Sequence, residues 1–256
     1  MNTFKFLPII MLTVLLTFSA YCDAEDDKDY TQYDTFRFTV NNKDAKTLTN
    51  NMRNHIKKYH VKGELKAKIY NVLYGENAND LIWVMGPVSF SEFDSLPDNK
   101  KHDNDWADNI NPYITSYKQS EIWRNMDGLM INNRKKKDDA PEKYITRYLT
   151  INSDQDEDDI KYLLNQVKMT LDKTGKVKYW AVMENKFIQG NLNGRHLMAI
   201  SSMESWAELD KDWEFAKHFD ALYGKGSIKA FADNWSKVFK NQWQEIIVVN
   251  KKMSGL

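Results

Sequence analysis

Histidine is the side chain in this sequence with the widest chemical range, because imidazole transfers protons near neutral pH and binds metals. The 256-residue chain contains five histidines. His218 lies between Lys217 and Phe219 on a predicted helix, and His196 begins a predicted strand. We take both as candidates for a proton-transferring catalytic residue. A histidine in an ordinary surface or core position is the alternative for each.

The spacing of the remaining histidines argues against a zinc site. His55 and His60 share a predicted helix but are five residues apart, whereas two ligands on one helical face are three or four apart. The acidic run at 154–159 resembles the start of a calcium loop, but it lacks the glycine and places Asn165 where glutamate belongs. A helix capped within residues 153–154 explains the run better, since the helix dipole favours acids in the first turn. We therefore predict no metal site.

No recognised catalytic motif is present. The sequence contains no Gly-x-Ser-x-Gly elbow, phosphate-binding loop, His-Glu-x-x-His motif or dinucleotide fingerprint. The single cysteine, Cys22, falls within a predicted targeting segment. Thiol catalysis and stabilising disulfides are therefore excluded for a chain from which that segment is removed.

The charge balance bears on the class of partner. Lys and Arg together number 36, and so do Asp and Glu. A neutral chain lacks the basic surface that binding to phosphates requires, so we predict no nucleic-acid partner. With 42% hydrophobic and 13% aromatic residues, the chain has ample material for packed cores.

The N-terminal segment has the features of a signal peptide. Lys5 precedes an apolar run at 6–20 that is too short for a membrane span. We predict that residues 1–24 are removed, that the mature form has no integral membrane span, and that the protein is exported to a periplasm or secreted. A lipoprotein anchored through Cys22 is the alternative, although Tyr21 is bulky where a small residue is expected.

The rest of the chain repeats one order of elements, β-α-β-β-α-β. Alternating apolar residues predict the strands, and apolar residues three and four apart predict the helices. Serine side chains supply helix caps at Ser89 or Ser91 and at Ser202. In the first copy the predicted strands are 36–41, 68–73, 81–88 and 128–132, and the predicted helices are 45–59 and 89–96. In the second copy the predicted strands are 146–152, 177–183, 196–201 and 245–250, and the predicted helices are 160–171 and 202–209. Each copy has a further helical region, around Trp106 in the first and Trp213 in the second.

These elements define the predicted domains. They are a signal peptide at 1–24, a disordered acidic N-terminus at 25–34, a first α+β unit at 35–132, a charged linker at 133–143, a second α+β unit at 144–250 and a tail at 251–256.

This organisation resembles the dimeric α+β barrel superfamily, which includes antibiotic-biosynthesis monooxygenases, EthD-like proteins and NIPSNAP proteins. The topology of residues 35–250 carries the resemblance, together with the helix starts at Phe93–Leu96 and Trp206–Leu209. It implies an α+β fold in which two tandem ferredoxin-like units pack sheet to sheet as an internal pseudo-dimer. The backs of the sheets would then be buried, leaving the helix-covered sides as the places for a cavity.

The resemblance also indicates where a ligand would lie. Members of the superfamily usually bind it between the sheet and the helices of a unit. The aromatic residues expected there could line a pocket for a small apolar or aromatic ligand, with the two candidate catalytic histidines nearby. Packing in the core is the alternative for these residues. They are Trp83, Trp180, Trp206, Trp213 and Tyr223.

Haem is the cofactor that the resemblance suggests. Haem-degrading members of the superfamily use an Asn, a Trp and a His, and Asn41, Trp83 and His102 stand in a similar order here. His102, however, lies in a polar stretch at 98–103 that we predict to be exposed.

Three classes of function are compatible with the sequence. The first is a small-molecule-binding protein that need not be catalytic. The second is a monooxygenase-like enzyme, either cofactor-free or haem-using. The third is a surface or assembly protein whose pockets are filled by its own side chains.

Overall fold

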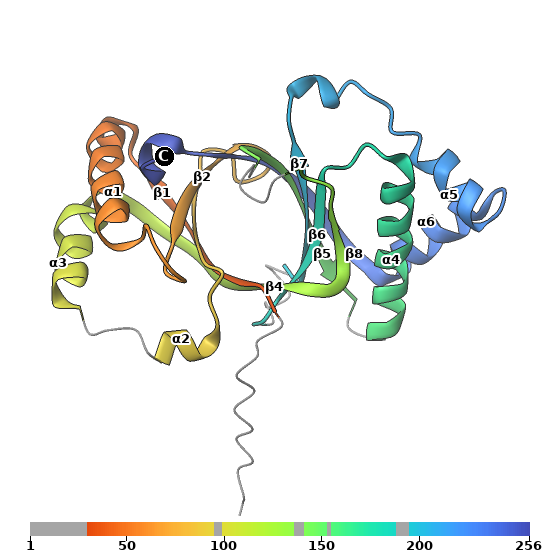
Figure 1. Ribbon diagram of the computed structural model, residues 1–256, viewed down its shortest axis with the longest axis horizontal. Coiled ribbons are helices and arrows are strands. Elements are labelled where there is room, and N and C mark those ends of the chain that lie inside the picture. Colours follow the sequence, from red (N-terminus) through yellow and green to blue (C-terminus); the bar gives the residue numbers. More distant parts are fainter. Residues whose placement is uncertain (1–29, 95–98, 136–140, 153–154, 188–194) are drawn as a thin grey trace, which may run out of the picture.

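The fold is built around a closed barrel of eight antiparallel strands, seen in a computed structural model (Figure 1). The structure describes residues 30–94, 99–135, 141–152, 155–187 and 195–256. The strands are β1 (Gln32–Val40), β2 (Ala67–Tyr74), β3 (Leu81–Met85), β4 (Ile114–Asn132), β5 (Lys143–Ile151), β6 (Tyr179–Asn185), β7 (Leu197–Met203) and β8 (Phe239–Val249).

The order of the strands follows the two halves of the chain. The first half contributes β4-β1-β3-β2 and the second β8-β5-β7-β6. Two antiparallel seams join them: β2 pairs with β8, and β4 pairs with β6. The predicted α+β fold is confirmed at this level. The sheets meet at their edges, however, so their backs enclose an interior and are not pressed flat against each other.

Helices cover the outside of the barrel in two groups, one on each side (Figure 1). Those of the first half are α1 (Ala45–Tyr59), the short α2 (Phe90–Asp94) and α3 (Lys100–Asn109), joined by the C-terminal α7 (Lys251–Ser254). Those of the second half are α4 (Glu157–Thr174), α5 (Phe215–Tyr223) and α6 (Ser227–Val238). Single 3-10 turns occur at Asn42–Asp44, Asn111–Tyr113 and Trp206–Glu208.

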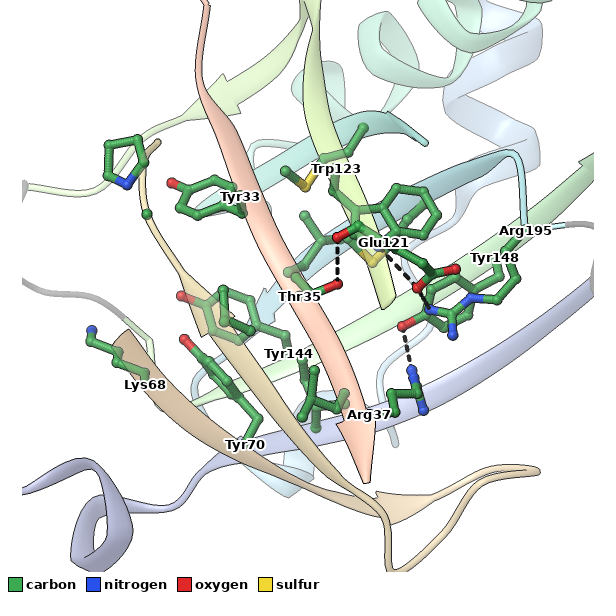
Figure 2. Close-up of a pocket in the computed structure, with 18 of the residues that line it drawn as sticks. Tyr33, Thr35, Arg37, Lys68, Tyr70, Glu121, Trp123, Tyr144, Tyr148 and Arg195 are labelled. Atoms are coloured by element: carbon green, nitrogen blue, oxygen red, sulfur yellow. Dashed lines mark hydrogen bonds and ion pairs between the residues drawn. The ribbon is translucent and has the colours of Figure 1, made fainter. Parts of the chain in front are cut away.

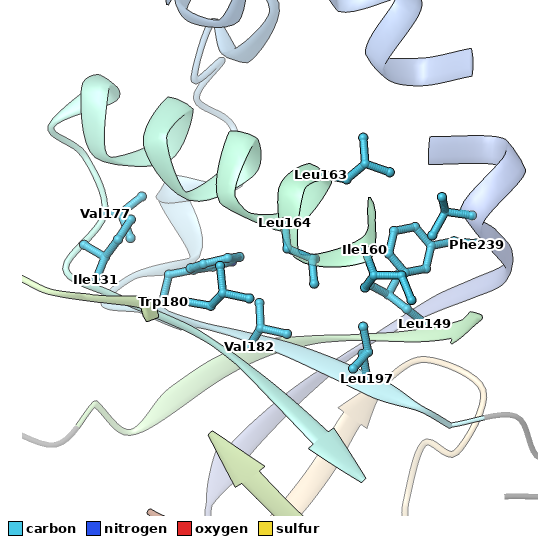
Figure 3. Close-up of a cluster of buried hydrophobic side chains, with 12 residues drawn as sticks. Ile131, Leu149, Ile160, Leu163, Leu164, Val177, Trp180, Val182, Leu197 and Phe239 are labelled. Carbon is cyan, nitrogen blue, oxygen red and sulfur yellow. The ribbon is translucent and has the colours of Figure 1, made fainter. Parts of the chain in front are cut away.

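Apolar side chains fill the space between helices and barrel. On α1, Leu48 and Met52 are fully buried and belong to one cluster with Ile69 and Trp83 from the strands. Figure 3 shows the corresponding cluster of the second half, where Leu164 of α4 lies over the strands. Each fully buried Leu or Met contributes about 1.5–3 kcal/mol. The helix-covered sides are thus the two cores of the molecule.

Alternation along β1 divides its side chains between core and barrel interior. Phe36 and Phe38 face the helices and belong to the core cluster of the first half. Thr35 and Arg37 point the opposite way, into the barrel. Successive strand residues face opposite sides of a sheet, so one strand supplies both environments.

Several predicted boundaries need correction. Strand β1 begins at Gln32, inside the segment predicted to be disordered, and β4 has 19 residues where only 128–132 was predicted. The helix predicted at 202–209 is a single 3-10 turn, because β7 continues through Ser202 and the cap is Ser205. The predicted tail contains α7, whose Met253 is buried in the first-half core.

The predicted helix at 160–171 is α4, and its N-cap is Asp156, which accepts from the backbone N–H of Asp158 at 2.8 Å. The cap predicted at 153–154 and the signal peptide at 1–24 lie outside the described residues. Among the helices of the described residues, none is sufficiently long and apolar to cross a membrane.

Candidate functional site

The candidate site is a cavity of about 450 Å³ inside the barrel. Side chains from both halves of the chain line it, and Figure 2 shows most of them. Two buried arginine–glutamate pairs lie at one end, and four tyrosines bordered by three cations lie at the other. The polar residues are Tyr33, Thr35, Arg37, Lys66, Lys68, Tyr70, Glu121, Arg134, Tyr144, Tyr148, Tyr179 and Arg195, and apolar walls are formed by Ile82, Val84, Trp123, Met183, Met198, Ile200 and Ile247.

A buried ion pair occupies the charged end. Arg37 is 2% exposed and donates to both carboxylate oxygens of Glu245, at 2.5 and 3.2 Å. It also donates to the hydroxyl of Tyr148 at 2.7 Å. Burial alone would lower the pKa of Arg37, but Tyr148 and Glu245 outweigh it and raise the pKa above its usual value. The guanidinium therefore stays charged and fixed.

A second pair lies beside the first. Arg195 forms an ion pair with Glu121, with 3.2 Å between a guanidinium nitrogen and a carboxylate oxygen, and its guanidinium stacks 3.9 Å from the centre of the Tyr148 ring. Trp123 also donates to the Glu121 carboxylate, at 3.2 Å. Burial raises the pKa of Glu121, and Arg195 and Arg37 oppose that rise. Two arginines thus meet two glutamates, and the charges of this end cancel.

Four tyrosines form the opposite end of the cavity. Burial is the main cause that raises the pKa of each phenol, and it brings that of Tyr144 to about 12. They are neutral near pH 7 and can donate or accept hydrogen bonds. They are Tyr33, Tyr70, Tyr144 and Tyr179.

Three cations border the tyrosines. Lys66 is exposed, while Lys68 and Arg134 are partly buried, and Arg134 lies 4.6 Å from the ring centre of Tyr179. Burial lowers the pKa of Lys68, and the neighbouring Lys66 lowers it further. Within the ranges that the structure describes, no carboxylate forms an ion pair with any of the three. Counting only the described residues, this end therefore carries three cations without an acidic partner.

The aromatic residues predicted to bind a ligand do not line this cavity. Trp83 and Trp180 are 3% and 5% exposed and belong to the two core clusters on the helix-covered sides. Trp213 packs against the second-half cluster, and Trp206 and Tyr223 are exposed. The structure brings Trp180 and Trp213 into one core but unites none of the five in the barrel cavity.

The candidate catalytic histidines also lie away from the cavity. His196 is partly buried just before β7 and accepts from the backbone N–H of Ile151 at 3.0 Å. His218 is partly buried on α5, in the helical layer outside the barrel. Neither lines the cavity wall.

The five-residue separation of His55 and His60 does not keep their rings apart, contrary to what we inferred from the spacing. Helix α1 ends at Tyr59, and His60 has left helical geometry, so the chain turns back and both rings approach His102. One ring nitrogen from each of the three histidines lies within 4.8 Å of the others. His102 is on α3 with 30% of its side chain exposed, so the predicted exposed position is corrected to a partly exposed one.

This arrangement does not suit haem on the first-half side. The Nε2 atoms of His60 and His102 are 3.1 Å apart, and Trp83 is enclosed by Phe36, Trp106 and His60 with ring centroids within 5.7 Å. A porphyrin needs an open slot beside its axial histidine, and these rings fill that space. Asn41 caps the 3-10 turn at 42–44 instead of facing His102.

Sequence reasoning missed the polar interior of the barrel. The signal was present in the strands, because Tyr33, Thr35 and Arg37 alternate with the residues that face the helices. The same alternation occurs at Tyr144 and Tyr148 of β5. An alternating strand has two faces, and a polar second face indicates a solvated or functional surface, not a packed one.

The fold is similar to several solved structures. An anthrone oxidase-like protein matches with a TM-score of 0.53 and 11% identity over 87% of this chain and 92% of its own. A candidate monooxygenase from Fusobacterium nucleatum matches with a TM-score of 0.53 and 10% identity over 87% of this chain and 94% of its own. A chlorite dismutase variant from Candidatus Nitrospira defluvii matches with a TM-score of 0.53 and 8% identity over 88% of this chain and 94% of its own. These likenesses show that the fold, an α+β barrel of eight antiparallel strands, is shared with these proteins.

No protein-family profile and no curated protein sequence matches this chain.

Proposed function

We propose that this protein binds a small organic anion with an aromatic or apolar body inside the barrel. The uneven charge of the cavity wall carries the proposal. Arg37 and Arg195 are neutralised by Glu245 and Glu121, whereas Lys66, Lys68 and Arg134 have no acidic partner among the described residues. Phenols beside these cations supply hydrogen bonds, and the apolar walls accept a hydrophobic body.

The test compares aromatic carboxylates with their uncharged amides. We expect calorimetric titration of the purified protein to detect binding of benzoate or naphthoate. The tryptophan fluorescence of the protein should also change on binding, because the indole of Trp123 lines the cavity. The matched amides should bind more weakly, because they lack the charge that the lysines complement. Equal binding of acid and amide, or binding of neither, would contradict the proposal.

A matched pair of variants locates the site. Lys68→Gln should weaken carboxylate binding roughly fivefold, which corresponds to about 1 kcal/mol for a partly exposed ion pair. Lys62→Gln is the control, because Lys62 is exposed and lies outside the cavity wall. Equal effects of the two substitutions on carboxylate affinity would place the binding elsewhere.

We also infer that the two halves form an internal pseudo-dimer. An offset of 111 residues pairs Tyr33 with Tyr144 and Arg37 with Tyr148, and all four side chains line the cavity. The seams obey the same symmetry, since the second strand of each half pairs with the last strand of the other. A fragment of residues 30–132 that is a folded monomer would contradict this inference.

A monooxygenase-like activity is the alternative function. It is supported by the descriptions of two similar structures, an anthrone oxidase-like protein and a candidate monooxygenase. Oxygen consumption on addition of a bound aromatic acid would favour it, and a strong visible absorption band would reveal haem. The positions of His196 and His218 outside the cavity wall favour binding without catalysis.

We further propose that the protein acts outside the cytoplasm. The support is the sequence of residues 1–24, in which Lys5 precedes the apolar run at 6–20. Mass spectrometry of the chain recovered from the medium or periplasm should find Glu25 at the N-terminus. A lipid on Cys22 would indicate the lipoprotein alternative, and an uncleaved cytoplasmic chain would contradict export.

A further inference from the structure

Three of the five histidines converge in one cluster outside the barrel, between α1 and α3. His55 comes from α1, His60 from the residue after it, and His102 from α3. Figure 1 shows the two helices side by side on the same side of the barrel. The cluster lies in the first half and is separate from the barrel cavity, whose wall contains no histidine among the described residues.

The hydrogen bonds of the rings orient their remaining nitrogens. Nδ1 of His60 donates to the carbonyl oxygen of Leu65 at 2.8 Å, because a carbonyl only accepts. Nδ1 of His102 contacts a carboxylate oxygen of Asp103 at 2.9 Å. A neutral imidazole whose Nδ1 carries the proton has a lone pair on Nε2. In both rings the nitrogen free to bind a metal is therefore Nε2.

These two Nε2 atoms face each other at 3.1 Å. Two lone pairs at that distance repel unless a cation lies between them, or unless one ring gains a second proton. Ligands about 2.1 Å from a tetrahedral metal are about 3.4 Å apart. The observed separation is thus close to the edge of a metal coordination tetrahedron.

His55 is the third histidine of the cluster, and one of its ring nitrogens is buried without a hydrogen-bond partner among the described residues. Its side chain is fully buried, and its Nδ1 contacts Asp105 at 2.7 Å. Its Nε2 has no hydrogen-bond partner within the described part of the chain. Buried polar atoms are nearly always satisfied, so an orphaned imidazole nitrogen in a cluster of imidazoles points to an absent ligand.

The outer contacts are those that metal-binding histidines use. Each ring is held through Nδ1 by a carboxylate or a backbone carbonyl, which fixes its orientation and makes Nε2 more basic. Aromatic side chains also pack against the rings: Trp83 lies 4.8 Å from His60, and Trp106 lies 5.3 Å from His55, both between ring centroids. The rings are thereby held in place before any metal arrives.

We propose that His55, His60 and His102 form a binding site for a divalent transition metal such as Zn²⁺. Three imidazoles favour zinc, cobalt, nickel or copper over the hard cations magnesium and calcium. With three protein ligands, a tetrahedral ion keeps a fourth position for water or another small ligand. His60 and His102 are already 3.1 Å apart, so the widest separation, up to 4.8 Å, involves His55, and closing it to a tetrahedral edge requires a shift of about 1.4 Å between His55 and the other two rings. Partly exposed His102 provides an entry path.

The test uses Co²⁺ as a spectroscopic substitute for Zn²⁺. Full-length protein without a polyhistidine tag is stripped with a chelator and titrated with Co²⁺. We expect one ion per chain and the intense visible absorption of a tetrahedral cobalt site, which Zn²⁺ should abolish by displacement. The proposal would be overturned if the folded protein gave no tetrahedral cobalt spectrum. It would also be overturned if the number of Co²⁺ ions bound per chain did not change when a histidine of the cluster is replaced.

Variants assign the site to the cluster. His102→Gln is preferred because His102 is partly exposed, so the chain should still fold, and circular dichroism checks this. We expect it to weaken Co²⁺ binding at least a hundredfold, and Asp105→Asn to weaken it roughly tenfold through His55. His218→Gln is the matched control on α5 and should bind as the parent chain does. Equal affinities for His102→Gln and His218→Gln would overturn the proposal.

Thermal unfolding gives a second readout that does not depend on spectroscopy. A ligand that binds only the folded state raises its stability by RT ln(1 + [L]/Kd). Zn²⁺ should therefore raise the Tm of the parent chain and of His218→Gln, and leave that of His102→Gln unchanged. A rise of equal size in all three would place the metal elsewhere on the surface.

Discussion

At the scale of single residues, the Arg37–Glu245 pair is the charge interaction most deeply enclosed by the barrel. Both side chains are at most 2% exposed. Glu245→Gln would leave the arginine charge in the interior with the Tyr148 hydroxyl at 2.7 Å and the Asp80 carboxylate, itself paired with Lys118, at 3.9 Å. Since removing one partner of a buried pair is costly, we expect a loss of about 3 kcal/mol in the free energy of unfolding, measured with urea.

An exposed pair provides the comparison for this substitution. Lys161 and Glu157 form an ion pair on α4 with 51% and 75% of their side chains exposed. Glu157→Gln should change the urea midpoint very little, because solvent screens such pairs. A midpoint shift for Glu245→Gln as small as that for Glu157→Gln would show that the barrel network does not stabilise the fold.

Asp34 makes stability depend on pH. Burial raises its pKa from 3.8 to about 6. The folded state therefore binds this proton more tightly than the unfolded chain, so the stability it contributes is full below pH 3.8 and is lost as the pH rises through about 6. Asp34→Asn should increase the unfolding free energy at pH about 8 by about 2 kcal/mol, with the gain disappearing near pH about 4.

The control for Asp34 is an exposed carboxylate on α3. Asp108→Asn should leave the profile of unfolding free energy against pH unchanged, since Asp108 is exposed. If the gain for Asp34→Asn were the same at every pH, its cause would be packing and not the buried charge.

At the scale of elements, α7 is short but tied to the first half. Met253 is 3% exposed in the first-half core, and the Ser254 hydroxyl accepts from the backbone N–H of Ile69 at 2.9 Å. Met253→Ala should lower the unfolding free energy by about 2–4 kcal/mol. Leu256→Ala should have little effect in the same denaturation experiment, because Leu256 is 67% exposed. Equal effects would mean that α7 does not contribute to the core.

Sequence periodicity located most elements but misjudged those whose exposure varies along their length. Strand β4 pairs with β1 in its first part and with β6 in its last, so its pattern changes midway around Gly128. Only its apolar end could be recognised. The turn at Trp206 has a serine cap and an apolar start like a helix, but it stops after three residues.

At the scale of the whole molecule, the sequence was sufficient to predict an α+β fold with a repeated element order. The sequence was not sufficient to locate the cavity, because the alternation of residues along a strand does not predict whether two sheets pack face to face or pair at their edges. Closure through the β2–β8 and β4–β6 seams turns residues such as Arg37 and Tyr144 into a cavity wall. The His55, His60 and His102 cluster likewise depends on where α1 ends.

The position of α7 also has a consequence for the order in which the protein matures. Helix α7 completes the core of the half that is synthesised first, since Met253 joins the cluster around Trp83. The first half therefore cannot reach its final packing until α7 has been synthesised. For the export proposed above, this dependence would delay stable folding of the first half until α7 has followed it across the membrane.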